Sequence, residues 1–308
     1  MRQRYEEEAL YLNLPENSEL DQYFSPKEKA RIKNVTDYQA EMADDILNPK
    51  SSTGLFLPWK KAVDFKVRPG EVTLHSGFNG AKKSMVLGLM QMGFMAQEEK
   101  TLTISLEMSP KTTLNRMMRQ YCGTGQIGVD EQTAFFEFAK GRMLIYDQLG
   151  TVQWKRIISV CRYAATLGVT QIIVDSLMKC GIPSGNLELQ AQFLDELCAA
   201  AKDCQLHIHL VAHAKKPTQD HGDKKPPSKY DIAGSGDLSN QADNVMIHFS
   251  NPDPLGSYSQ MVIISKQRNP ETDNSEPSYI FGFDNGSLQL TDNGTVMFPT
   301  DWQEQLWT

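Results

Sequence analysis

The sequence predicts an α/β fold in which helices flank a mostly parallel, twisted sheet. Short apolar runs typical of buried strands alternate with longer stretches of helical periodicity. The strand-like runs cover 72–74, 101–106, 143–146, 171–174 and 206–212, and the helical stretches cover 84–98, 110–121, 131–140, 151–167 and 187–203. This alternation is typical of parallel strands joined by covering helices. Two later runs, 244–249 and 261–264, lack a useful helix between them, so we expect antiparallel strands at the C-terminal edge.

A further helix is predicted ahead of this domain. Ser25-Pro26-Lys27-Glu28 has the pattern of a capped helix start, with Ser at the N-cap and Pro at the first helical position. Tyr38, Met42 and Ile46 recur every four residues and form one apolar stripe before Asn48-Pro49 ends the helix. Such a stripe packs either on the helix's own domain or on a neighbouring subunit, and the pattern leaves both open.

Composition and charge limit the class of protein. Apolar residues make up 40% of the sequence and charged residues 22%, as in ordinary globular proteins. No apolar run approaches the length of a membrane span and the N-terminus lacks a signal-peptide core, so we expect a cytoplasmic protein. The five cysteines contain no C-x-x-C pair, which favours free thiols and argues against structural zinc. At a net charge of −7, a polyanion would have to bind at a local basic patch.

The stretch around residues 77–84 has the pattern of a phosphate-binding loop. Gly77, Lys83 and Ser84 match the fixed positions of G-x-x-x-x-G-K-[ST], between a predicted strand and a predicted helix. Such a loop aims backbone N–H groups and a helix N-terminus at phosphates, while its lysine neutralises charge. The residues expected to bind a nucleotide are Gly77, Asn79, Gly80, Ala81, Lys82, Lys83 and Ser84. Lys82 stands where the template has Gly, so its side chain either crowds the loop or adds a phosphate contact.

Two predicted strands end in a carboxylate. Ile172-Ile-Val-Asp175 is an apolar strand ending in an acid, and we expect Asp175 to hold Mg²⁺ together with the Ser84 hydroxyl. Glu107 follows the strand 101–106 and would face the crevice in which α/β sheets bind ligands. There it can orient or deprotonate an attacking water, although it could also cap the helix that follows.

The strand-like run 206–212 is followed by a histidine. His213 stands level with Asp175 and could hydrogen-bond a γ-phosphate, whereas we expect His207 and His209 to be buried within the strand. Farther on, Val262-Ile-Ile-Ser ends in Lys266 and, two residues later, Arg268. These cations could reach a γ-phosphate across a subunit boundary, or simply form the charged end of a surface strand.

One irregular loop, 214–230, concentrates positive charge. Its lysines are Lys215, Lys216, Lys224, Lys225 and Lys229. Phosphate neutralisation would make this loop a DNA contact with salt-dependent affinity, while the ordinary alternative is a solvated loop.

Taken together, these motifs resemble the RecA-like helicase domain of the DnaB/Twinkle family, especially the helicase part of phage primase–helicases. The resemblance runs from about Leu57 to Leu290 and rests on five blocks in family order. The blocks are Arg68-Pro-Gly-Glu-Val, Ser105-Leu-Glu-Met, Ile172-Ile-Val-Asp-Ser, the segment from Asp231 to Asp243, and Ile263-Ile-Ser-Lys-Gln-Arg-Asn.

The resemblance implies a RecA-like P-loop ATPase domain over residues 55–308 and an N-terminal extension over 1–54 whose helix docks on the next subunit. It implies a helicase of replicative type, dependent on ATP and Mg²⁺, that unwinds forked duplex DNA. Such a protein works as a homo-oligomeric ring, usually a hexamer, and moves along single-stranded DNA. If the source is a phage, the location is the host cytoplasm.

The resemblance also implies roles for individual residues. Glu107 would be the catalytic base, His213 the γ-phosphate sensor, and Lys266 with Arg268 the finger given to a neighbouring subunit. The DNA-binding loops would lie near Lys179–Leu187 and Lys215–Gly236. In the second loop, the small residues Gly234, Ser235 and Gly236 would let backbone N–H groups approach phosphates.

The sequence departs from the family at Lys82 and carries nothing that resembles a primase, so a separate primase or loader would be a partner. Two other functions stay open. One is a recombinase-like or clock-type RecA ATPase that does not unwind DNA. The other is a ring that binds DNA or a partner and has an impaired P-loop.

Overall fold

The computed structural model describes residues 33–47, 54–183, 185–215, 225–234, 236–253, 258–270, 276–292 and 294–296. The chain divides into two units, Met1–Ser52 and Thr53–Thr308. The predicted helix start at Ser25, and Lys216, Lys224 and Ser235, lie outside the described residues. Among the described residues, no helix is long and apolar enough to cross a membrane.

The described part of the first unit is one short helical segment. A 3-10 helix, η3 (Val35–Tyr38), leads into α3 (Gln39–Leu47). Asn34 caps the start, because its side chain accepts from the Thr36 backbone N–H at 3.1 Å. The apolar stripe predicted on this helix is exposed: Met42 is 63% and Ile46 79% accessible.

The second unit is built on a ten-stranded sheet in the order β12-β11-β10-β9-β8-β3-β7-β6-β4-β5. The six strands from β8 to β5 are parallel, and β9 to β12 continue the sheet in antiparallel pairs. The predicted parallel sheet with an antiparallel C-terminal edge is therefore confirmed. A separate two-stranded sheet pairs β1 (Leu55–Phe56) with β2 (Lys66–Val67). The strands of the large sheet are β3 (Val72–Ser76), β4 (Thr101–Ser105), β5 (Met143–Ile145), β6 (Gln171–Asp175), β7 (His207–Val211), β8 (Asn244–Ser250), β9 (Gln260–Lys266), β10 (Ser278–Asp284), β11 (Gln289–Asp292) and β12 (Thr295–Val296).

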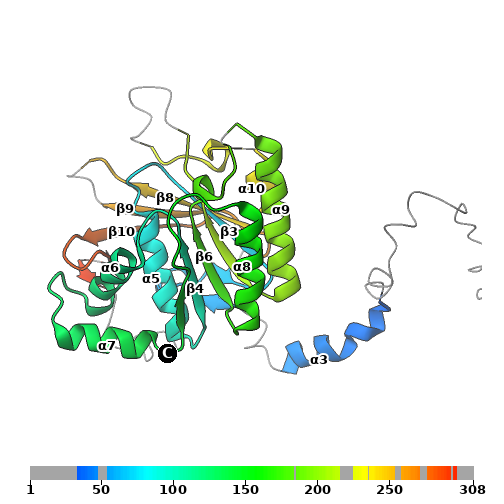
Figure 1. Ribbon diagram of the computed structural model, residues 1–308, viewed down its shortest axis with the longest axis horizontal. Coiled ribbons are helices and arrows are strands. Elements are labelled where there is room, and N and C mark those ends of the chain that lie inside the picture. The colour runs from blue at the N-terminus through cyan, green and yellow to red at the C-terminus, as the bar shows by residue number, and fades with distance from the viewer. Residues whose placement is uncertain are drawn as a thin grey trace, which may run out of the picture. The chain divides into compact units, whose positions relative to one another are not determined.

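Helices cover both faces of the parallel strands (Figure 1). On one face, α8 and α9 pack their apolar side chains against the sheet, and the short α10 packs on α9. On the other face, α5 lies against the sheet and α6 and α7 lie outside it. The helix bounds are α5 (Lys83–Ala96), α6 (Pro110–Cys122), α7 (Val129–Ala139), α8 (Trp154–Thr166), α9 (Leu187–Cys204) and α10 (Asp237–Gln241). The sheet therefore separates two apolar cores.

A polar cluster of four histidines lies inside the α5 side of the sheet. His75 of β3 lies between two others: its Nδ1 is 2.9 Å from His248 Nε2 and its Nε2 is 3.0 Å from His209 Nδ1. His207 pairs with Thr73 Oγ1 at 2.8 Å and with the Arg68 carbonyl at 2.7 Å. All four rings are fully buried, as predicted for the pair on β7. The cluster adjoins the loop that follows β3, because His75 precedes Gly77 by two residues and the backbone carbonyl of His248 lies against Gly77.

Candidate functional site

The loop between β3 and α5 has the backbone that a phosphate-binding loop requires. A Cβ on Gly77 would lie 2.3 Å from the carbonyl oxygen of His248, so only glycine fits there. Gly80 takes a φ of +81°, which also favours glycine. Lys83 extends its ammonium back across the loop and donates to the carbonyls of Gly77 and Phe78 at 2.9 and 3.0 Å. The loop and the start of α5 thus surround one cationic group.

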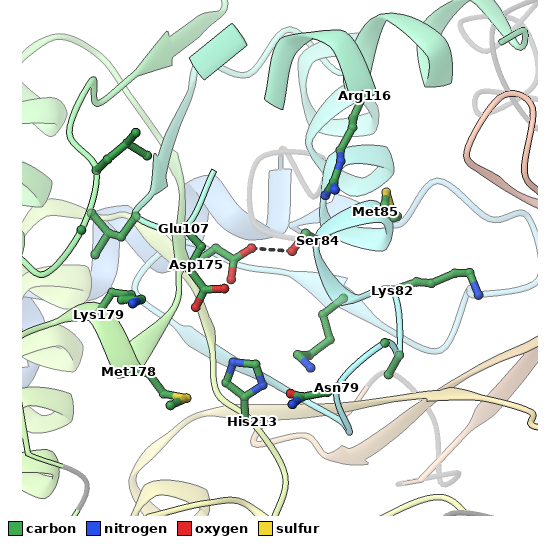
Figure 2. Close-up of a pocket in the computed structure, with 16 residues that line it drawn as sticks. Asn79, Lys82, Ser84, Met85, Glu107, Arg116, Asp175, Met178, Lys179 and His213 are labelled. Carbon is green, nitrogen blue, oxygen red and sulfur yellow. Dashed lines mark hydrogen bonds between the residues drawn. The ribbon is translucent and has the colours of Figure 1, made fainter. Parts of the chain in front are cut away.

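Lys82 takes the left-handed conformation at the N-cap of α5, with φ 57° and ψ 25°. This is the region in which glycine is unstrained and other residues cost about 1–2 kcal/mol, which explains why the loop template has Gly here. The Lys82 ammonium lies 4.6 Å above the ring of Phe283 in β10. In Figure 2 the side chain extends away from Glu107 and Asp175, so it does not crowd the loop.

The two carboxylates predicted at strand ends lie next to each other. Ser105 of β4 pairs in register with Asp175 of β6, which brings Glu107 beside Asp175 (Figure 2). The Ser84 hydroxyl donates to Asp175 Oδ2 at 2.5 Å. The Ser176 hydroxyl donates to Glu107 Oε1 at 2.6 Å and fixes that carboxylate at the sheet edge. Glu107 is therefore not a cap of α6; Ser109 is, because its side chain accepts from the Thr112 backbone N–H at 3.2 Å.

These groups surround a cavity of about 850 Å³. It is lined by residues predicted from the sequence, namely Asn79, Gly80, Ala81, Lys82, Lys83, Ser84, Glu107, Asp175 and His213. His213 lies two residues beyond β7, and its Nδ1 is buried with no hydrogen-bond partner among the described residues. The volume falls in the range of small-molecule and cofactor sites.

The cavity also includes residues that the motifs did not indicate. Arg116 reaches it from α6, and Met178 and Lys179 come from the turn after β6 (Figure 2). The family resemblance places Lys179 at the start of a DNA-binding loop, whereas in the structure it lines this cavity. No motif in the sequence marks Arg116 as part of this cavity.

Burial and neighbouring charges shift the pKa values of the site. Burial raises the pKa of Asp175, and the hydrogen bond from Ser84 opposes that shift. Burial lowers the pKa of Lys83, while the two nearby carboxylates oppose the change. Burial, together with Lys83, lowers the pKa of His213, so that its ring is neutral at pH 7. A neutral imidazole can donate one hydrogen bond to a phosphate oxygen.

The oxygens of Ser84 and Asp175 fit a magnesium ion. Mg²⁺ prefers oxygen donors and keeps several waters, and it commonly binds through one or two protein oxygens plus substrate phosphates. Lys83 and His213 lie near the buried Asp175 carboxylate, and their charges act to lower its pKa. A divalent cation at this position would favour the ionised carboxylate that burial disfavours.

The structure does not bring Lys266 and Arg268 to this cavity within the same chain. The Lys266 ammonium donates to the carbonyls of Ser239, Asn240 and Ala242 at 2.9, 2.7 and 2.6 Å. These bonds cap the C-terminal end of α10. Arg268 pairs with the buried Asp243 at 2.7 Å. Their predicted action on a neighbouring subunit stays a prediction.

The described part of the basic loop is partly exposed. Lys215 and Lys225 are exposed, whereas Lys229 pairs with Glu276 at 3.0 Å. Gly234 has a φ of +126°, a conformation that strains residues other than glycine, and a Cβ there would lie 2.2 Å from the end of the Gln190 side chain. A Cβ on Gly236 would meet open space.

Solved structures with the same fold include two helicases. The first, the ATPase domain of a phage helicase, superposes with a TM-score of 0.71 over 85% of this chain and 99% of that chain, at 15% identity. The second is a DnaB-like replicative helicase whose structure is described with its interactions with primase; it has a TM-score of 0.67, covers 86% of this chain and 69% of that chain, and is 14% identical. At these identities the likeness shows a shared RecA-like fold. A search of curated proteins finds no match.

A match to a family model identifies the family of this chain more directly than the shared fold does. The model of the DnaB-like helicase C-terminal domain matches residues 76–283, which is more than half of the chain. The match begins at the end of β3, directly before the phosphate-binding loop, and ends in β10. The chain therefore belongs to the DnaB-like helicase C-terminal domain family.

Proposed function

We propose that this protein is an ATP-dependent DNA helicase of replicative type. The observation that carries the proposal is the convergence of Lys83, Ser84, Asp175, Glu107 and His213 on one cavity at the carboxyl ends of parallel strands. That edge is where open α/β sheets bind ligands, and this set of groups suits hydrolysis of a nucleoside triphosphate.

Each group has a defined task in this proposal. The loop backbone and Lys83 bind the phosphates, and the N-terminus of α5 adds its positive dipole end. Ser84 and Asp175 would hold Mg²⁺, which neutralises developing charge on the phosphates when bound. Glu107 accepts the proton of the attacking water; because Ser176 occupies one of its carboxylate oxygens, the other is left to face that water.

His213 and the basic loop connect hydrolysis to DNA. His213 lines the cavity, so its ring would donate a hydrogen bond to a γ-phosphate bound there. Lys215 and Lys225 are exposed cations on the chain that follows and would bind the phosphates of single-stranded DNA. Lys229 has a carboxylate partner and would contribute less.

A ring of copies would complete the site. Lys266 and Arg268 lie outside the chain's own cavity, and a residue acting on a neighbouring subunit's nucleotide must do so. The exposed apolar stripe of α3 would dock on the next copy, because such a stripe is stable only when it is covered. By analogy with the family, a separate primase or loader is the further partner.

A forked-duplex assay tests the proposal. With ATP and Mg²⁺, we expect DNA-stimulated hydrolysis and strand displacement by the natural protein. Glu107→Gln should lower both rates by about 10²–10⁴, the usual contribution of a general base, while nucleotide binding persists. Glu137→Gln is the matched control, because Glu137 is an exposed surface residue of α7.

Three outcomes would contradict parts of the proposal. Hydrolysis without strand displacement would favour a recombinase-like or clock-type ATPase. DNA binding without hydrolysis in the natural protein would indicate a binding ring with an impaired loop. A monomeric mass by light scattering, with ATP and DNA present, would contradict the ring.

A further inference from the structure

Tyr230 is the most exposed aromatic side chain among the described residues. Its accessible fraction is 73%, compared with 65% for Tyr163 on α8, 45% for Phe136 and 42% for Tyr38. It belongs to η6 (Lys229–Asp231), a single 3-10 turn on the C-terminal side of the basic loop. An aromatic ring in this position has no part in the core and none in the nucleotide cavity.

The turn that carries Tyr230 is held firmly from both sides. Ser228 and Asp231 cap it reciprocally: Asp231 Oδ2 accepts from the Ser228 backbone N–H at 2.8 Å, and Ser228 Oγ accepts from the Tyr230 N–H at 3.3 Å. Next to the turn, the Lys229 ammonium donates to the carbonyl of Ser265 at the end of β9, at 3.3 Å. Ile232 anchors the chain in the core with 3% exposure. The ring is thus displayed by a fixed backbone.

Backbone hydrogen bonds join this turn to the nucleotide loop. Lys215 N–H donates to the Asp231 carbonyl at 2.7 Å, and Ala233 N–H donates to the His213 carbonyl at 2.7 Å. Ala214, between them, donates its N–H to the carbonyl of Gly77 at 3.1 Å. The backbone around Tyr230 is therefore connected by hydrogen bonds both to the strand end at His213 and to the phosphate loop.

Lysines flank the turn that carries the ring, and the nearest of them, Lys229, is paired with Glu276. Lys215 is the ladder partner of the turn, Lys229 precedes Tyr230, and Lys225 lies five residues earlier, with Lys215 and Lys225 exposed. The Lys229 ammonium lies 5.7 Å from the Tyr230 ring centroid. Cations that follow a phosphate backbone, together with an aromatic face, form the usual combination for binding single-stranded nucleic acid.

From this geometry we infer that Tyr230 is a base-stacking residue for single-stranded DNA. The inference rests on the proposed function and adds a contact to bases where the lysines contact phosphates. The phenol ring stacks on a base without reading its identity, because every base has a π-face. Its turn is hydrogen-bonded to the strand end at His213, which connects the stacking position to the nucleotide site.

Binding measurements on two kinds of strand test this contact. The full-length protein, with a non-hydrolysable ATP analogue, is titrated against an oligo-dT strand and against an abasic strand of equal length. Tyr230→Ala should weaken binding of oligo-dT on the order of tenfold, which is typical of losing one base–aromatic stack. Tyr230→Phe keeps the ring and should bind like the natural protein. Tyr163→Ala is the matched control, an exposed tyrosine on α8.

The abasic strand separates stacking from other effects. It offers phosphates but no bases, so Tyr230→Ala should bind it as well as the natural protein does. Equal losses on both strands, a loss no greater than that of Tyr163→Ala, or a reduced oligomer mass for Tyr230→Ala would each overturn the stacking role. If the natural protein binds neither strand, the proposed helicase function fails as well.

Discussion

Acid should unfold this protein through its four buried histidines. Burial lowers the pKa of His207 from 6.5 to about 4 and that of His248 to about 3. Burial also lowers the pKa values of His75 and His209 well below 6.5, and neighbouring histidines add to the shift. In the unfolded chain all four rings would titrate near 6.5. The unfolded state therefore binds more protons below that pH, and stability is lost as the pH falls from 6.5 toward the folded values.

The size of the effect follows from linkage. Each ring that is neutral when folded and charged when unfolded lowers the free energy of unfolding by about 1.4 kcal/mol for every pH unit below 6.5. At pH 5 this amounts to about 2 kcal/mol for one ring and about 8 kcal/mol for four. Asp175, whose raised pKa has the opposite sign, offsets part of the loss. Because domains are stable by about 5–15 kcal/mol, we expect acid unfolding near pH 5.

Urea titrations between pH 7.5 and 5, at fixed protein concentration and without nucleotide, measure this slope. Followed by far-ultraviolet circular dichroism, they should give an uptake of about three to four protons on unfolding at pH 5. His207→Gln removes one buried titrating ring, while its amide can still reach Thr73 and the Arg68 carbonyl, so the uptake should fall by about one. His213→Gln is the control at a half-buried ring. An uptake below two, or a larger drop in the control, would refute the reasoning.

Three further predictions concern the site. Asp175→Asn should raise the Mg²⁺ concentration needed for half-maximal ATP hydrolysis by about 10- to 100-fold, measured by titrating the metal. Lys82→Gly should leave the rate of ATP hydrolysis within the natural order of magnitude. The change relieves about 1–2 kcal/mol of left-handed backbone strain and loses about 0.5–1 kcal/mol of cation–π contact. A steady-state ATPase assay measures this rate, and a 100-fold gain would contradict the prediction. Replacing Lys215 and Lys225 together by Ala should reduce the slope of log affinity against log salt by roughly 1.4 for single-stranded DNA, since each phosphate contact contributes about 0.7.

Sequence reasoning succeeded where one strand or one loop decides the outcome. The carboxyl ends of neighbouring parallel strands share an edge, so Asp175 and Glu107 had to approach each other once β4 and β6 were placed in the sheet. Gly77, Lys83 and Ser84 lie within eight residues, and their geometry follows from the strand–loop–helix order. Such predictions need only the residues of one short segment or the order of two neighbouring strands.

The missed features depend on packing between distant segments. Arg116 enters the cavity because α6 lies close to α5: a Cβ on Gly88 would lie 2.6 Å from Gln120 Oε1. No periodicity fixes that contact or the rotation of α6 about its axis. The sequence indicated part of the histidine cluster, since His207 and His209 are two residues apart and lie on the same face of one strand. Its partners on β3 and β8 required the strand order of the sheet.

Lys82 shows what the phosphate-binding loop requires at its sixth position. The requirement is a backbone in the left-handed region, because that conformation ends the loop and starts α5. Glycine meets it without strain, but a lysine can meet it too when its side chain finds a stabilising contact. Phe283 supplies that contact, and it draws the ammonium away from the carboxylates that would hold magnesium. The Lys82 side chain thus leaves the arrangement of Lys83, Ser84 and Glu107 around the cavity undisturbed, and the departure from the loop template is compatible with the proposed ATP hydrolysis.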